Sequence, residues 1–207
     1  NNFLTHNNCK FTSLKKISKS KININKWIYS ELIKTKITVE KNIKEYRFDE
    51  AAKNLYQFVW HSYCDWYLEL SKTILYSDDK KNIKEVKSMI SYIFKEILIL
   101  THPFIPFITE EIWLKNKLDN SNRDFLMLKN WPSGKFKIDK DYRDVENIIH
   151  IISQIRSFKN ELNINPGSYI DVSLSKINKK NKVFFKNNEV VLKKLGRIKN
   201  FYNQDAK

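Results

Sequence analysis

Apolar residues recur at steps of three and four through most of the chain, and this period limits the possible folds more than any other feature. Such steps place side chains on one face of an α-helix, because 3.6 residues complete a turn. The pattern predicts helices over residues 25–46, 48–75, 83–100, 106–117, 145–162 and 183–195. Helices with one apolar face must bury that face, so we expect an antiparallel helical bundle.

Residues near the helix ends carry stop and start signals. Asn25 and Asp49 have side chains that accept hydrogen bonds from free N–H groups, and we expect them to cap the first two helices. His102-Pro103 should end the third helix, because proline disfavours helical geometry in the preceding residue.

The pattern changes in the last third of the chain. Ile170, Val172 and Leu174 alternate with polar residues, which predicts a strand, and a second strand is expected near Phe201. We therefore expect a mainly α protein with two domains. A helical bundle would cover residues 1–135, and a small α/β subdomain would cover residues 136–207.

Composition excludes several classes of protein. Only three glycines occur, far apart, so no phosphate-binding loop fits. No apolar run is long enough to span a membrane. The chain begins Asn-Asn-Phe, as an excised piece would. Cys9 and Cys64 are too few for a disulfide framework, and we expect a cytoplasmic setting.

The net charge is +15 and the pI is about 9.6. A charge of this sign favours a polyanionic partner. Lysine, asparagine and isoleucine are all abundant, however, and an AT-rich genome produces this excess in any protein. Both interpretations stay open from the sequence alone.

Three constellations have the residue types of catalytic or metal sites. Residues 16–20 (KISKS) resemble the KMSKS loop of class I synthetases, but no nucleotide-binding fold precedes them. His61 and Cys64 give two potential zinc ligands where four are needed. Glu110 and Glu111 diverge by about 100° on a helix, so they cannot act together on one substrate. A role in offsetting the helix dipole at a helix start is the better interpretation. We predict no catalytic residue, metal site or cofactor in this chain.

Aromatic residues crowd residues 56–67. Rings can stack on unpaired RNA bases, although helix geometry directs many of them into a core. Trp60 and Tyr67 lie off the main apolar stripe of residues 52, 55, 59, 62, 66 and 70. They are the better candidates for stacking.

Several strings resemble the anticodon-binding region of the valyl-tRNA synthetase family of class I aminoacyl-tRNA synthetases. They are residues 46–52 (YRFDEAA), 55–60 (LYQFVW), 64–69 (CDWYLE) and 102–113 (HPFIPFITEEIW). The last string is shared with leucyl and isoleucyl enzymes, whereas CDWYLE discriminates for valine. In this family residues 16–20 correspond to a variable connection, which makes the KMSKS match accidental.

The resemblance implies a parent enzyme, an ATP-dependent (with magnesium) valine–tRNA ligase. Its catalytic and editing domains would precede residue 1, and a coiled coil would follow residue 207. The chain itself would be non-catalytic. Its partner would be valine tRNA, with no membrane or DNA partner.

Valine tRNAs carry A and C at the last two anticodon positions, and a protein that recognises the anticodon must splay these bases. We expect Lys41, Lys44, Arg47 and Lys53 to contact phosphates or base edges, and Phe48, Trp60 and Tyr67 to stack. One alternative is the same domain of an isoleucyl or leucyl enzyme. Another is a helical protein-interaction bundle whose charge comes from composition only.

Overall fold

The computed structural model describes residues 2–9, 20–116, 125–132, 142–175 and 177–203. It is mainly helical with a small two-stranded sheet, which confirms the predicted fold class. The chain divides into two compact units, Asn1–Lys140 and Asp141–Lys207. The predicted boundary between residues 135 and 136 lies outside the described residues and stays a prediction.

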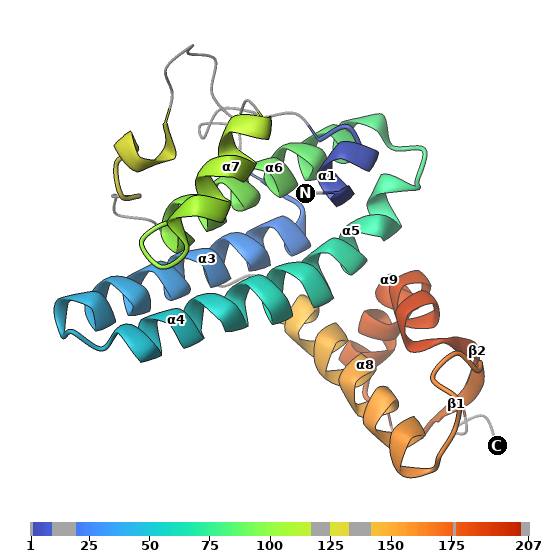
Figure 1. Ribbon diagram of the computed structural model, residues 1–207. Coiled ribbons are helices and arrows are strands. Elements are labelled where there is room, and N and C mark those ends of the chain that lie inside the picture. The colour runs from blue at the N-terminus through green and yellow to red at the C-terminus, as the bar shows by residue number, and fades with distance from the viewer. Residues whose placement is uncertain (1, 10–19, 117–124, 133–141, 176, 204–207) are drawn as a thin grey trace. The chain divides into compact units, whose positions relative to one another are not determined.

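The first unit consists of helices whose bounds agree closely with those predicted. They are α1 (Asn2–His6), α3 (Asn23–Lys44), α4 (Phe48–Gln57), the π-helix η1 (Phe58–Tyr67), α5 (Leu68–Leu75), α6 (Lys80–Thr101), α7 (Pro106–Asn116) and the 3-10 helix η2 (Leu126–Leu128). The segments α4, η1 and α5 form one continuous helix. Figure 1 shows α3 antiparallel to it, with α6 packed against both and α7 beside α6.

The predicted apolar face of α6 forms much of the core. Val86, Ile90, Ile93, Ile97 and Leu100 follow at steps of four and three, and each is at most 6% exposed. Full burial of such a side chain contributes roughly 1.5–3 kcal/mol. No helix within the described ranges is long and apolar enough to cross a membrane.

The cap predictions were wrong for both Asn25 and Asp49. Helix α3 starts earlier, with Ile22 as its N-cap, and Asn25 is fully buried. The Asn25 amide accepts a hydrogen bond from the Tyr67 hydroxyl (2.8 Å) and donates one to Ser20 Oγ (3.2 Å). Asp49 lies in the first turn of α4, where its charge favours the helix dipole.

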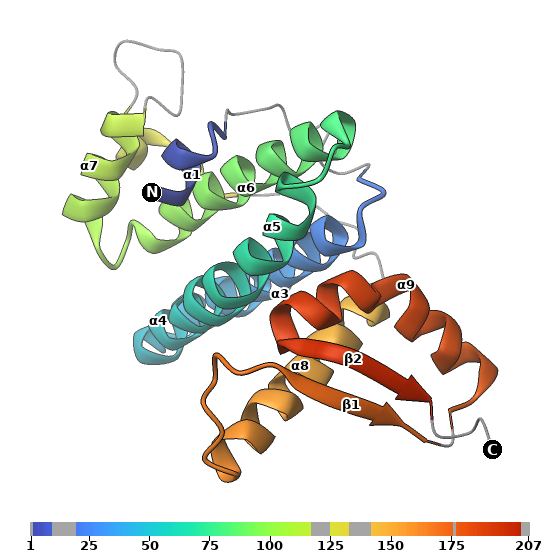
Figure 2. The same ribbon diagram turned by 90° about the vertical axis from the view of Figure 1, so that its right-hand side faces the viewer.

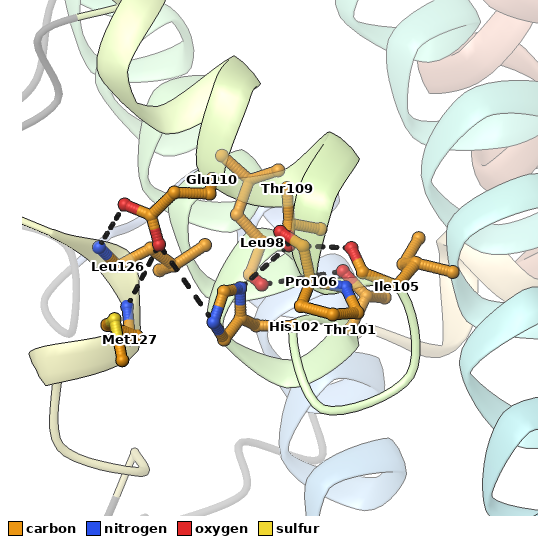
Figure 3. A network of polar contacts seen from close by, with 9 residues as sticks. All are labelled: Leu98, Thr101, His102, Ile105, Pro106, Thr109, Glu110, Leu126 and Met127. Atoms are coloured by element: carbon orange, nitrogen blue, oxygen red, sulfur yellow. Dashed lines mark hydrogen bonds and ion pairs between the residues drawn. The ribbon is translucent and has the colours of Figure 1, made fainter.

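The turn from α6 to α7 is held by side chains of the HPFIPFITEE string, as Figure 3 shows. The Thr109 hydroxyl lies 2.9 Å from the Ile105 carbonyl oxygen and 3.0 Å from that of Pro106. Because its single hydrogen goes to these carbonyls, its oxygen accepts from His102 Nδ1 (2.8 Å). The string therefore has a structural role in the bundle.

Glu110 ties η2 to the start of α7. Its two carboxylate oxygens accept backbone N–H groups of Leu126 (2.8 Å) and Met127 (3.2 Å) (Figure 3). Glu111 points elsewhere and pairs with Lys115 (2.7 Å). The two carboxylates diverge as predicted, but the predicted role at the helix start is wrong, because α7 begins at Pro106 and its first turn contains no acidic residue.

The second unit is a βαβ unit with one additional helix. It contains α8 (Arg143–Glu161), β1 (Ile170–Leu174), α9 (Lys179–Gly196) and β2 (Ile198–Asn203). The strands are parallel, with Ile170 opposite Ile198 (Figure 2). Helix α9 packs on both α8 and β2. The buried Lys159 ammonium donates to the carbonyls of Ser168 (2.7 Å) and Gly196 (3.4 Å). These bonds join α8 to the loop before β1 and to the last residue of α9.

A buried carboxylate makes the stability of the first unit depend on pH. Glu96 on α6 is 8% exposed, and burial raises its pKa from 4.5 to about 7, against the opposing effect of Lys36 and Lys95. Tyr29 and Tyr92 also face it. The folded state thus binds a proton between pH 4.5 and 7 that the unfolded chain has lost. This contribution to stability is present at pH 4.5 and is lost as the pH rises through 7.

We predict that Glu96→Gln removes this pH dependence. The fall in unfolding free energy between pH 5 and pH 8 should shrink by about 2 kcal/mol, because glutamine has no proton to lose. Urea unfolding at both pH values measures it. Glu111→Gln, at an exposed glutamate, is the control and should keep the wild-type slope. An equal slope in both variants would contradict the assignment.

Candidate nucleic-acid interface

The chain reverses direction sharply between α3 and α4. The Arg47 N–H donates to the Asn42 carbonyl (2.8 Å) and the Tyr46 N–H to that of Ile43 (3.1 Å), the two bonds of a Schellman motif. Tyr46 occupies the left-handed position with φ of 59°. Glycine is usual there, since a Cβ makes this conformation unfavourable by roughly 1–2 kcal/mol. The corner therefore holds a tyrosine where stability alone favours glycine.

Aromatic rings project into solvent at this corner. Tyr46 is 83% exposed and Phe48 is 52% exposed. Their rings meet edge to face, with centroids 6.3 Å apart. Adjacent exposed rings are uncommon on surfaces that bind nothing, because apolar area in water is unfavourable.

Further rings continue from the corner along α4 and η1. Phe48, Ala52, Tyr56 and Trp60 follow at steps of four, and all are exposed. The Tyr56 and Trp60 rings are nearly parallel, with centroids 6.5 Å apart and an angle of 6° between their planes. We call Phe48, Tyr56 and Trp60 the aromatic stripe. Flat exposed rings of this kind are typical platforms for stacking bases.

The lysines near the corner are matched by carboxylates. Lys41 pairs with Glu45 (3.9 Å), Lys44 with Glu40 (2.8 Å) and Lys53 with Glu50 (3.9 Å). The hydrogen bond from Lys44 lowers the pKa of Glu40.

Arg47 differs from these lysines. Within the described part of the chain, its guanidinium makes no hydrogen bond or ion pair. It is exposed directly beside Tyr46 and Phe48. Lys41 and Lys44 lie in the last turn of α3, Arg47, Phe48 and Lys53 lie at or near the start of α4, and Trp60 lies further along the same helix in η1. Figure 1 shows the corner between α3 and α4.

Tyr67 does not belong to this surface, which corrects the sequence prediction. It is fully buried, and its hydroxyl donates to Asn25. Burial raises the pKa of Tyr67 well above its ordinary value, so the hydroxyl keeps the proton it donates. Its ring cannot stack on a base.

The π-helix explains the error. From α4 through η1 to Leu70 in α5, the buried residues are Ala51, Leu55, Phe58, Tyr63, Tyr67 and Leu70. The step from Phe58 to Tyr63 is five residues, as expected where each turn is wider than in an α-helix. An α-helical period misses this step and assigns Trp66 in place of Tyr67 to the core. The prediction also placed Ala52 rather than Ala51 in the core, but this difference precedes the π-helix. Tyr46 and Tyr56 were also missed as surface rings. For Tyr46, the available signal was the break between two helical patterns directly after it. For Tyr56, the signal was its position four residues before Trp60, on the same side of a helix.

The other constellations have simpler roles where they are described. His61 lies 3.3 Å from Asp65, one turn further on, and Cys64 is half-buried with its pKa raised by burial. The described residues contain no group of three or more metal-ligating side chains. Of residues 16–20, only Ser20 is described, and its hydroxyl donates to Glu85.

Comparison with known proteins identifies the class to which this fold and surface belong. The chain belongs to the family of the anticodon-binding domain of tRNA ligases, which matches residues 25–174. Valine–tRNA ligase of Pelagibacter ubique is 63% identical over 99% of the chain, and that of Zymomonas mobilis is 32% identical over 99%. The Agrobacterium fabrum enzyme is 38% identical over 71%.

The chain spans about a quarter of the length of these relatives, 23% for the first two. It therefore corresponds to the anticodon-binding part of such an enzyme. The predicted resemblance is confirmed, and a general protein-interaction bundle no longer explains the sequence. All three relatives carry the valine name, in agreement with the CDWYLE string.

We predict that Tyr67→Phe lowers the unfolding free energy by about 1–3 kcal/mol, because the buried Asn25 carbonyl loses its donor. Urea denaturation measures this. Tyr56→Phe removes an exposed hydroxyl and should leave stability unchanged. RNA affinity should be unaltered in Tyr67→Phe at temperatures where it is folded. A loss of affinity there would restore Tyr67 as a contact residue.

Proposed function

We propose that this chain binds the anticodon loop of valine tRNA through the aromatic stripe and the corner beside it. The parent protein is then a cytoplasmic enzyme that attaches valine to its tRNA, using ATP and magnesium bound by other domains. The observation that carries the proposal is the row of exposed rings in a domain of the anticodon-binding family.

Stacking supplies most of the expected affinity. Each base stacked on an aromatic ring contributes roughly 1–3 kcal/mol. Splayed A and C bases of the valine anticodon lie on Phe48 and on the parallel Tyr56–Trp60 pair. Ala52 leaves room between these two platforms, because its side chain is a single methyl group.

Charged groups then orient the loop. The Arg47 guanidinium offers planar donors that match base edges and phosphates. Lys41, Lys44 and Lys53 exchange their carboxylate partners for RNA phosphates at little cost, because exposed ion pairs within a helix are worth only about 0.3–0.5 kcal/mol. Arg47 needs no such exchange with any described residue, and we assign it the leading polar role.

We predict that Arg47→Ala combined with Trp60→Ala weakens binding of valine tRNA by about tenfold or more, since one stacking platform and one cation are lost. Affinity is measured for the valine tRNA transcript and for the same transcript with a changed anticodon. The wild-type chain should prefer the first, and the double variant should lose most of that preference.

The matched control is Tyr76→Ala with Lys115→Ala. It removes an exposed ring and an exposed cation away from the corner. It should keep the wild-type preference. Equal affinity of the wild-type chain for both transcripts would refute anticodon reading.

We also predict opposite effects of Tyr46→Gly on stability and on binding. Glycine relieves the positive φ and should raise the unfolding free energy by about 1 kcal/mol. Loss of the ring should weaken tRNA binding about tenfold, because a stacking contact with a base is lost. Tyr46→Ala keeps the strain and should weaken binding without stabilising. Unchanged affinity in both variants would exclude Tyr46 from the interface.

A further inference from the structure

Positive charge is concentrated on one helix of the second unit. Helix α9 contains six lysines and one glutamate, whereas the neighbouring α8 has three basic and three acidic residues. A compositional excess of lysine would spread over both helices. All of α9 and β2 lie beyond residue 174, where the match to the anticodon-binding family model ends.

Four of the six lysines of α9 lie on one side of the helix. Lys179, Lys182, Lys186 and Lys193 follow at steps of three, four and seven, which keeps them on one side of a helix. Leu192, which lies to one side of this face, is buried. Lys193 pairs with Glu189 (2.6 Å). In the parts of the chain that are described, Lys179, Lys182 and Lys186 make no ion pair.

The lysines in the first turn of α9, Lys179, Lys180 and Lys182, are unfavourable for the helix itself. The first turn of a helix favours negative charge, and each opposing charge costs about 0.3–1 kcal/mol. The N-cap of α9 is the neutral Asn178, and its first turn contains no acidic residue. Helix α6 also starts with lysines, but Asp79 caps it and Asp78 precedes it. Helix stability therefore does not explain the lysines in the first turn of α9, whereas Lys193 and Lys194 in its last turn favour the helix dipole.

A groove between α8 and α9 opens beside the first turn of α9. Its volume is about 410 Å³, and side chains of Lys180, Asn181 and Phe184 line it from α9. Asn147, His150 and Asp144 line it from α8. Amide, imidazole and aromatic groups beside a lysine are the chemistry of nucleotide contacts, and the one carboxylate lies on the α8 side.

We propose that the lysine face of α9 (Lys179, Lys182 and Lys186) is a second RNA-binding surface, which contacts tRNA phosphates without reading sequence. This inference rests on the proposed function, since the partner is the same tRNA. The face fits phosphate better than lipid. Its exposed apolar residues are Val183 and Val190, and it lacks the large apolar or aromatic side chains that insert into a bilayer.

The test is a triple variant, Lys179→Gln, Lys182→Gln and Lys186→Gln, in the full chain. Binding of valine tRNA and of the anticodon-changed transcript is measured between 50 and 300 mM salt. The slope of log affinity against log salt should fall by about two, since each phosphate contact contributes roughly 0.7–0.9. Affinity should fall by about tenfold or more at 100 mM salt, by the same factor for both transcripts. Glutamine favours helix, and circular dichroism checks that α9 remains folded.

The charge-matched control changes Lys80, Lys81 and Lys84 of α6 to glutamine and should alter the slope by less than one. An equal effect of both triple variants would overturn the proposal in favour of net charge. An unchanged salt slope in the α9 variant would also overturn the proposal. If the wild-type chain binds anionic lipid vesicles and the α9 variant does not, the partner of this face is a membrane instead. Failure of anticodon reading appears separately, as equal affinity of the wild-type chain for the two transcripts.

Discussion

The hydrogen bond between the buried Tyr67 hydroxyl and Asn25 is the contact on which the shape of the bundle surface depends. It joins η1 to the first turn of α3. A parallel bond from Tyr63 to the Ile90 carbonyl (3.0 Å) joins η1 to α6. Both hydroxyls turn inward because the helix widens in the π-segment. Unpaired polar groups at these depths would be costly, so the two bonds hold the segment in register.

Trp60, in the same π-segment, is exposed, and its ring is nearly parallel to that of Tyr56. Rings carried on helices whose opposite face is buried keep their positions, which suits a surface that must hold splayed bases at fixed spacing. The rings of the stripe need no conformational change to be accessible.

Charge and shape are divided between different regions. At the corner, three lysines face three glutamates, so the net charge there is small and the rings with Arg47 carry the proposed selectivity. Helix α9 carries excess lysine without large exposed rings. Long-range phosphate attraction and short-range base contacts are distinct terms in RNA binding. In the two proposals, base contacts are made at the corner between α3 and α4, and phosphate attraction is supplied by α9.

Much of the architecture was predictable because it is local. The start of α4 at Phe48 and the end of α6 before Pro103 follow from periodicity and proline geometry alone. The cap predictions failed where a side chain found a distant partner. Asn25 has the chemistry of a cap, but the Tyr67 hydroxyl, 42 residues later in the chain, takes its carbonyl. Glu110 likewise binds backbone groups 16 and 17 residues away.

The sequence by itself determined the helical class, the strand pair and the family, since these depend on repeating patterns and on strings of neighbouring residues. Only the tertiary structure decided which rings reach solvent and which are core. A five-residue step in one helix rotates every later side chain relative to an α-helical period. That step is stabilised by hydrogen bonds from Tyr67 to Asn25 and from Tyr63 to the Ile90 carbonyl. These partners lie on other helices, and nothing within residues 58–67 identifies them.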